Sequence, residues 1–210
     1  MSAAVAGLLT VVATLVALVT PAPAMAAGTG WYMLVNDLYD GVNAPGPMRC
    51  LSTNAQPPAG GSGTHQVYLA GCNASTPGQW WWIDFDWGRT VPHSIEVTNY
   101  QNFDNAVWEL SSNLSTPPGN SAGTYAAYTA QRNQADGHQW SIFYDSGSEF
   151  KTIFVSKLSP SYALSASASN PLPGGGYRVY TSHPGFTAAQ HWRQYQPSNP
   201  PACSPCGRID

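Results

Sequence analysis

The stretch Gly78-Gln79-Trp80-Trp81-Trp82 decides the fold, because a shorter version of it occurs twice more along the chain. Each version places a glutamine or histidine two residues before a tryptophan: Gln79 before Trp81, His138 before Trp140 and Gln190 before Trp192. The three tryptophans are 59 and 52 residues apart. Self-similarity at such a period is the signature of an architecture built from repeated units. The sequence therefore predicts three copies of one structural unit.

A second landmark, of the form Leu-Ser, lies upstream of each triplet. It occurs at Leu51-Ser52, Leu110-Ser111 and Leu164-Ser165. The distances from the leucine to the following glutamine or histidine are 28, 28 and 26 residues. Two markers that keep nearly the same separation in three places set the register of the three units.

Each unit contains about four short segments that are typical of β-strands. The expected strands are an apolar opening run (31–35, 95–97, 153–155), the Leu-Ser strand, an alternating strand (67–69, 125–128, 177–180) and a strand after the triplet (81–85, 140–144). Turn-forming proline and glycine separate the second and third strands of each unit. A unit of this size cannot bury a face alone, so the sequence predicts an all-β fold in which three units share one core about a pseudo-threefold axis.

The composition agrees with short strands. Charged residues make up 9% of the 210-residue chain, well below the roughly 25% of average proteins. Tyrosine, tryptophan, glycine and proline are plentiful, which favours strands and tight turns over long helices. The formal net charge is −3 and the lysines and arginines are scattered, so we expect no nucleic-acid partner.

The amino-terminal segment predicts secretion. Residues 3–20 form an uncharged apolar run, and the small residues Ala24 and Ala26 fit a signal-peptidase site. The run also approaches the length of a membrane span, so an uncleaved anchor is the alternative. We expect residues 1–26 to be a signal peptide, 27–197 a single domain, and 198–210 a tail rich in proline and cysteine. After removal of the signal peptide, we expect an extracellular protein with no membrane span.

The four cysteines, Cys50, Cys72, Cys203 and Cys206, allow three disulfide pairings. Disulfides are the default in a secreted chain. Pairing Cys50 with Cys72 and Cys203 with Cys206 keeps each bridge local, and we favour this arrangement. The Cys-x-x-Cys spacing of the second pair also occurs at redox and zinc sites, but zinc would need two further ligands nearby and the sequence offers none there.

The first unit carries a family resemblance. Its pattern is Cys50-Leu51, then Val67-x-Leu69-x-x-Cys72, then Gln79-x-Trp81. This resembles the repeat of ricin B-chain-type β-trefoil lectins, which also occur as carbohydrate-binding modules of secreted bacterial hydrolases. The resemblance extends over about residues 31–197 and implies a β-trefoil. In the other two units, His138 replaces one motif glutamine, and the positions equivalent to the disulfide fall on Glu109 with Gln131 and on Ala163 with His183.

In that family, the tryptophan of each triplet packs into the shared core and the glutamine ties backbone between strands. The resemblance therefore implies a structural core of Leu51, Gln79, Trp81, Leu110, Trp140, Leu164, Gln190 and Trp192. Trp80 and Trp82 point to the other side of the strand. They either pack under a neighbouring loop or form an exposed aromatic platform for a sugar ring.

The resemblance also indicates a degenerate sugar pocket. Family members with a working galactose-type pocket have an aspartate directly after the leucine landmark, where this chain has serine three times. The family's stacking aromatic falls on Ala70, Thr129 and Thr181, and Tyr128 and Tyr180 lie one residue away. A neutral hydrogen bond is about half as strong as a charge-assisted one, so binding would be weakened. The candidate carbohydrate-binding residues are Ser52, Asn54, Ser111, Tyr128, Ser165 and Tyr180.

Catalysis is not expected. The string Gly-x-Ser-x-Gly at 119–123 lacks the strand before it and the helix after it that a nucleophile elbow needs. Asp84 and Asp86 are interpreted as acids on a solvated strand end, and the histidines have no metal spacing, so no cofactor or metal is expected. The leading hypothesis is a secreted, non-catalytic lectin that binds a glycan or polysaccharide. The alternative is a β-trefoil that has lost sugar recognition and binds or inhibits a protein partner.

Two structural features would separate these hypotheses. A groove lined by tyrosine and asparagine beside one of the serine landmarks favours a sugar. A projecting variable loop, of which residues 37–48 are the longest, favours a protein partner.

Overall fold

The computed structural model describes residues 30–39, 47–54, 63–83, 95–103, 106–115, 123–131, 136–144, 151–158, 160–173 and 175–200. The expected signal peptide, Asp84, Asp86, Cys203, Cys206 and positions 119–122 lie outside these ranges. In the part that is described, no helix has the length and apolar character needed to cross a membrane.

The described residues form twelve β-strands and four short 3-10 helices. They are β1 (Gly30–Asn36), η1 (Asp37–Tyr39), β2 (Arg49–Thr53), β3 (Thr64–Gly71), η2 (Pro77–Gln79), β4 (Trp81–Ile83), β5 (Ile95–Phe103), β6 (Ala106–Ser112), β7 (Thr124–Gln131), η3 (Asp136–His138), β8 (Gln139–Tyr144), β9 (Lys151–Ser156), β10 (Ala163–Pro171), β11 (Tyr177–Ser182), η4 (Ala188–Gln190) and β12 (Trp192–Tyr195). The expected all-β character is confirmed. We call residues 30–83, 95–144 and 151–195 the first, second and third segments; each contributes four strands.

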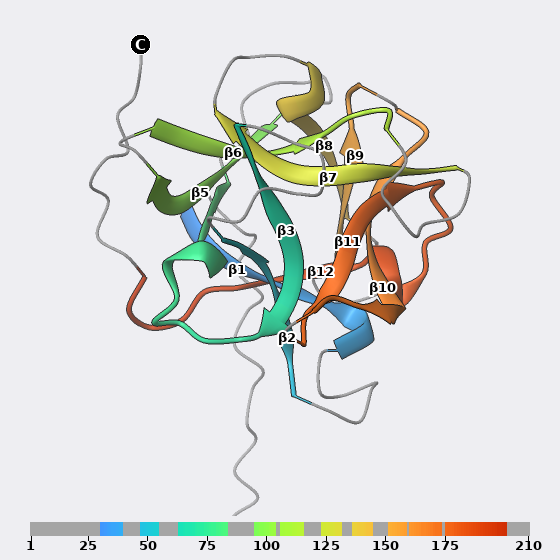
Figure 1. Cartoon of the computed structure of the whole chain (residues 1–210). Coiled ribbons are helices and arrows are strands. Elements are labelled where there is room, and N and C mark those ends of the chain that lie inside the picture. The colour runs from blue at the N-terminus through green and yellow to red at the C-terminus, as the bar shows by residue number, and fades with distance from the viewer. Residues whose placement is uncertain are drawn as a thin grey trace, which may run out of the picture.

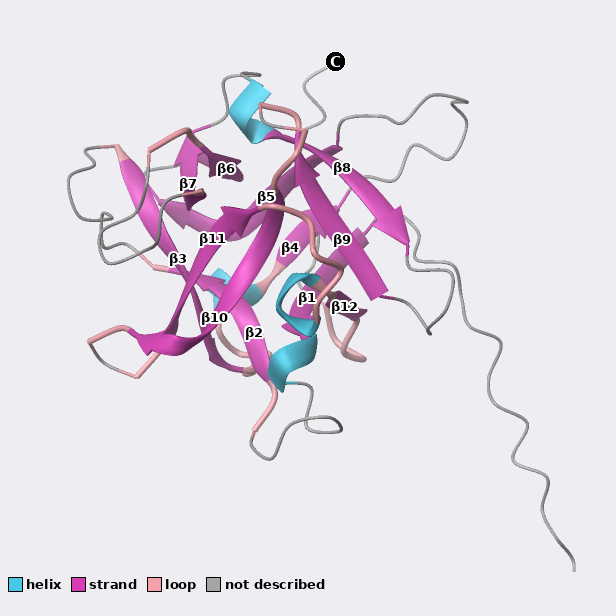
Figure 2. Ribbon diagram, turned by 90° about the vertical axis from the view of Figure 1, so that its right-hand side faces the viewer, coloured by secondary structure: helices cyan, strands magenta, loops and turns pink. Residues whose placement is uncertain are grey.

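Strand pairing closes two rings. Six strands pair in the cyclic order β1, β4, β5, β8, β9, β12 and back to β1, all antiparallel. The other six form the hairpins β2–β3, β6–β7 and β10–β11. The third strands of the segments, β3, β7 and β11, pair with one another in a triangle, which surrounds the centre of Figure 1. The chain is thus a six-stranded barrel capped by three hairpins, with β1, β12 and β9 adjacent on one side (Figure 2).

The core contains the tryptophan of each triplet and the leucine of each landmark, and all six side chains are fully buried. Each buried indole needs a hydrogen-bond acceptor, and each finds it in its own segment. The Nε1–H groups of Trp81, Trp140 and Trp192 donate to the carbonyls of Leu51, Leu110 and Leu164 at 2.9, 2.9 and 3.0 Å. In each of the three segments, the triplet tryptophan therefore contacts the leucine of the Leu-Ser landmark.

The glutamines of the first and third segments tie the chain just after the third strand. Gln79 Nε2 donates to the Gly71 carbonyl at 2.9 Å, and its Oε1 accepts from the Asn73 amide at 2.7 Å. Gln190 makes the same pair of bonds, to the His183 carbonyl and from the Gly185 amide, both at 2.7 Å. Both ends of each glutamine amide are used to hold backbone.

A second apolar cluster lies apart from the main core. It contains Trp31, Met33, Val35, Cys50 and Trp80, with Cys72 and Trp82 packed against it. Trp80 is only 2% exposed and its indole donates to the Ala74 carbonyl at 2.8 Å. Trp82 is half-buried and meets Trp31 edge to face, with ring centroids 5.5 Å apart. The exposed-platform hypothesis is therefore wrong for Trp80, because the side chain packs into this cluster instead.

The expected Cys50–Cys72 disulfide is confirmed, with the two Cα atoms 5.0 Å apart. It links the start of β2 to the chain just beyond β3, so it fastens the base of the first hairpin. The second expected bridge, Cys203–Cys206, lies outside the described residues.

Side-chain π contacts join consecutive segments at equivalent places. Each connects the beginning of a third strand to a residue in the second strand of the next segment or, for Tyr162, directly before it. The pairs are His65 with Trp108 (ring centroids 4.2 Å apart), Tyr125 with Tyr162 (4.6 Å) and Tyr177 with the Arg49 guanidinium (4.6 Å). The last contact returns from the third segment to the first, so these interactions also form a closed ring.

Candidate functional site

Each serine landmark faces a tyrosine across its hairpin. The strand register places Ser52 opposite Tyr68, Ser111 opposite Tyr128 and Ser165 opposite Tyr180. Directly opposed residues in antiparallel strands share one face of the sheet. The structure thus brings four of the predicted site residues, Ser111 with Tyr128 and Ser165 with Tyr180, into two pairs. It adds a third pair through Tyr68, which the sequence analysis missed.

The sequence-based alignment of the third strands was wrong by one residue in the second and third segments. Thr129 and Thr181 lie opposite Leu110 and Leu164 and are buried on the core side. Ala130 and Ser182 take the position that Ala70 has in the first segment. Gln131 likewise corresponds to Gly71 and not to Cys72. Gln131 lies seven residues before His138, whereas Gly71 lies eight residues before Gln79.

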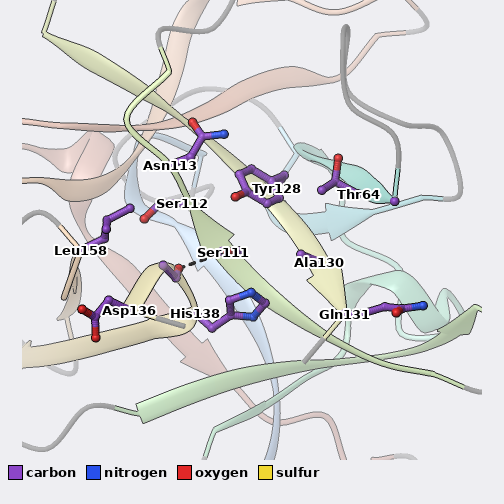
Figure 3. Close-up of a pocket in the computed structure, with 12 residues that line it drawn as sticks. Thr64, Ser111, Ser112, Asn113, Tyr128, Ala130, Gln131, Asp136, His138 and Leu158 are labelled. Carbon is purple, nitrogen blue, oxygen red and sulfur yellow. Dashed lines mark hydrogen bonds between the residues drawn. The ribbon is translucent and has the colours of Figure 1, made fainter. Parts of the chain in front are cut away.

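A cleft of about 610 Å³ opens at the second Ser–Tyr pair. Its lining comes from β3, β6, β7, η3 and the turn after β9. The lining residues are Gly63, Thr64, Ser111, Ser112, Asn113, Tyr128, Ala130, Gln131, Asp136, Gly137, His138 and Leu158. Figure 3 shows Tyr128 and His138 on opposite sides of the cleft, with Ser111 close to His138. This volume lies within the range of small-molecule sites.

Buried polar groups line the deepest part of this cleft. Ser111 is buried, and its Oγ–H donates to the carbonyl of Gly137, which is also buried, at 3.2 Å. His138 is 3% exposed, and its Nδ1 lies 3.1 Å from Oε2 of Glu109, a carboxylate with no exposed surface. An added Cβ at Gly137 would lie 2.6 Å from the Ser112 carbonyl. Glycine therefore permits the close approach of η3 to the end of β6.

The walls of the cleft offer one aromatic ring and several polar groups. Tyr128 is half-buried. Asn113 accepts the Ser115 amide proton on Oδ1 at 2.9 Å, so its amide NH₂ is the group directed away from the backbone. Asp136 is exposed and lies 3.4 Å from the ammonium of Lys157. The cleft thus combines an apolar ring face with neutral donors and acceptors, and a carboxylate only at the rim.

The other two pairs have different surroundings. Ser165 bonds internally, to Ser182 Oγ at 2.6 Å and Gln190 Nε2 at 3.1 Å. Burial raises the pKa of the Tyr180 hydroxyl above its usual value. At the first pair, Ser52 donates to its neighbouring Cys50 carbonyl at 3.1 Å. Asn54, the remaining predicted site residue, is half-buried after β2 and is not in the lining of the cleft.

No protein-family model matches the chain, and no curated protein matches its sequence. The structure does have solved relatives in shape. The ricin B-like lectin of Macrolepiota procera, solved in complex with lactose, matches with a TM-score of 0.50 and 14% identity, over 81% of this chain and 98% of the lectin. The fold is a β-trefoil. The designed threefold-symmetric protein ThreeFoil matches with a TM-score of 0.53 and 16% identity, over 80% of this chain and 99% of its own.

The β-trefoil also matches parts of larger proteins. A mosquitocidal holotoxin aligns with a TM-score of 0.56 and 16% identity, over 80% of this chain but 17% of the toxin. The O-mannosyltransferase complex Pmt1–Pmt2 of S. cerevisiae aligns with a TM-score of 0.61 and 15% identity, over 82% of this chain but 25% of its own. At these identities the likeness shows the fold alone.

Among the described residues, no three histidine, cysteine, aspartate or glutamate side chains come together to hold a metal ion. The cleft offers polar side chains that can form hydrogen bonds, from Asn113, Ser111 and His138. It also offers one apolar ring face, from Tyr128.

Proposed function

We propose that the protein is a secreted, non-catalytic carbohydrate-binding β-trefoil whose working site is the cleft between Tyr128 and His138. The observation that carries the proposal is the groove itself, which tyrosine and asparagine line beside a serine landmark. We further infer that the three segments are copies of one unit about a pseudo-threefold axis. The recurring Trp–Leu hydrogen bonds and the two closed strand rings support this inference.

A sugar ring fits this chemistry because it has an apolar face of C–H groups and an edge of hydroxyls. The ring of Tyr128 can pack against the face, and Asn113 can donate to a hydroxyl. The serine at position 111 supplies a neutral group where an aspartate would give a charge-assisted bond. Since charge-assisted bonds are about twice as strong, we expect a modest affinity per site, which a polymeric glycan with many copies of its unit would compensate through avidity.

Replacing Tyr128 by alanine is expected to weaken glycan binding about tenfold or more, equivalent to about 1.4 kcal/mol. The physical reason is loss of the only tyrosine, phenylalanine or tryptophan ring in the lining of the described cleft. The measurement is a glycan array and a polysaccharide pull-down with the full secreted chain, followed by titration of the best ligand.

Two variants control this experiment. Tyr128→Phe keeps the ring and should retain most of the affinity. Tyr180→Ala removes the equivalent tyrosine of the third segment, which does not line the described cleft, and should bind as the wild type does. Absence of binding to β-galactosides, xylans and mannans by the wild-type protein would rule out the proposed function.

A protein-binding role is the second candidate, and one observation favours it. Phe186 is 68% exposed and has a backbone φ of 48°. A bulky residue in the left-handed region is strained, and such strain often accompanies recognition. If the glycan screens are negative, a photo-crosslinking residue at position 186 would test this role by trapping a protein partner.

A further inference from the structure

The motif corner of the second segment is built differently from the other two. In the first and third segments, both ends of the glutamine amide bond to backbone groups at the end of the third strand or just beyond it. In the second segment, His138 takes this place and bonds instead to the side chain of Glu109 on β6. The described cleft lies at this corner. The described cleft is therefore bordered by the segment that lacks the glutamine tie.

The contact with Glu109 determines which edge of the imidazole meets the cleft. Nδ1 faces the buried carboxylate at 3.1 Å. The two ring nitrogens lie on opposite edges, and the partner of one nitrogen fixes the orientation of the other. His138 belongs to the lining of the cleft, and Figure 3 shows its imidazole on the side opposite Tyr128. A buried polar side chain is thus aimed into the site.

We propose that His138 is a ligand-binding residue that hydrogen-bonds a sugar hydroxyl through Nε2, and that Glu109 is the positioning residue that holds its ring. This inference rests on the proposed function and names a contact of the same site. A hydroxyl is both donor and acceptor, so it can pair with Nε2 in either protonation state. The ligand is thereby gripped between the ring of Tyr128 on one side and His138 on the other.

A purely structural role for the pair makes different predictions. Glu109 has the place on β6 that the disulfide-bonded Cys50 has on β2, since they lie opposite Ala130 and Ala70. The pair could therefore only fasten the second hairpin, as the disulfide fastens the first. In that case its removal would lower stability and leave ligand affinity unchanged.

The test is His138→Gln, which installs the residue found at the other two corners. We expect the ligand retained by the wild-type protein to bind about 3- to 10-fold more weakly, the effect of one hydrogen bond. Because the buried Glu109 loses its imidazole partner, the variant is also expected to be less stable, so affinity is measured at a temperature at which it is folded. Gln190→His, the reverse change in the third segment, is the matched control and should alter stability but not affinity.

Glu109 is tested by a pair of variants. Glu109→Ala frees the imidazole and should weaken binding about 3- to 10-fold. Glu109→Gln keeps a hydrogen-bond partner for Nδ1 and should restore most of the affinity. A merely structural Glu109 would give no such rescue of binding, measured at a temperature where both variants are folded.

A spectroscopic readout separates contact from indirect effects. The imidazole resonances of His138 should shift saturably as ligand is added, while those of His183 and His191 should not. If the wild-type protein binds ligand and Tyr128→Ala does not, but His138→Gln binds with unchanged affinity, the assignment of His138 is overturned and the proposed function stands. If the wild-type protein binds no glycan at all, both are overturned.

Discussion

Replacing Trp140 by alanine is expected to lower the free energy of unfolding by about 3–5 kcal/mol, the usual cost of truncating a buried tryptophan. The side chain is fully buried in the main core, so its removal leaves a cavity that the barrel strands cannot fill. The change also leaves the buried Leu110 carbonyl without its indole donor. Urea denaturation followed by circular dichroism measures the effect.

Two controls divide this loss into its parts. Trp140→Phe keeps most of the apolar area but not the hydrogen bond, and should cost about 1–3 kcal/mol through the unpaired carbonyl and the smaller ring. The side chain of Trp82 is half-buried and packs against the second cluster. Trp82→Ala should therefore lower the free energy of unfolding less than Trp140→Ala. If the two alanine variants are equally unstable, the triplet tryptophans do not form the main core as described.

The main outline of the fold could be predicted from local pattern. The spacing of Leu110 from the triplet matches that of Leu51, and each pair ends in the same indole–carbonyl bond. Alternation placed the third strands, and burial follows it: Val67 and Leu69 are buried on β3, as are Ala127 and Thr129 on β7. These features depend on residues close in sequence, so a single chain is enough to reveal them.

Strand register was less accessible. The third strand of the second segment ends seven residues before His138, whereas that of the first ends eight residues before Gln79. Counting back the same number of residues from the triplet in each segment therefore matches the wrong residues of the two strands. Register is determined by which residues bond across the hairpin, such as Ser111 opposite Tyr128, and the sequence contains no direct record of that pairing. A one-residue error in register moves a side chain to the other face of a sheet. For this reason the sequence alignment matched Ala70 with the buried Thr129, although its structural equivalent is Ala130.

Contacts between distant side chains could not be predicted. Glu109 and His138 are 29 residues apart, and nothing in their spacing indicates a buried pair. The sequence does contain a clue to this pair. Glu109 stands where the first segment has Cys50, and His138 stands where it has the motif glutamine Gln79. Two departures from a pattern within one unit are a signal that the residues at those positions interact.

Replacing Asp37 by asparagine is expected to destabilise the protein by about 3 kcal/mol, at the low end of the cost of breaking a buried ion pair. The residue begins the segment that is expected from the sequence to be a variable loop, yet it is 1% exposed at the start of η1. Its carboxylate accepts a hydrogen bond from Arg193 Nε at 2.7 Å and lies 2.6 Å from Lys151 Nζ. These cations come from β12 and β9, so the aspartate fastens β1 to two other barrel strands. The neutral amide would leave Arg193 and Lys151 without their counter-ion.

The estimate stays at the low end because both cations are partly exposed and can regain water when the carboxylate is lost. Asp136→Asn is the matched control: its ion pair with Lys157 is exposed on both sides, and such pairs contribute about 0–1 kcal/mol. The difference between the two variants should persist in 1 M salt, since buried charges are screened far less than exposed ones. Equal stabilities in high salt would show that Asp37 acts as a surface charge, and its proposed role in joining the barrel strands would fail.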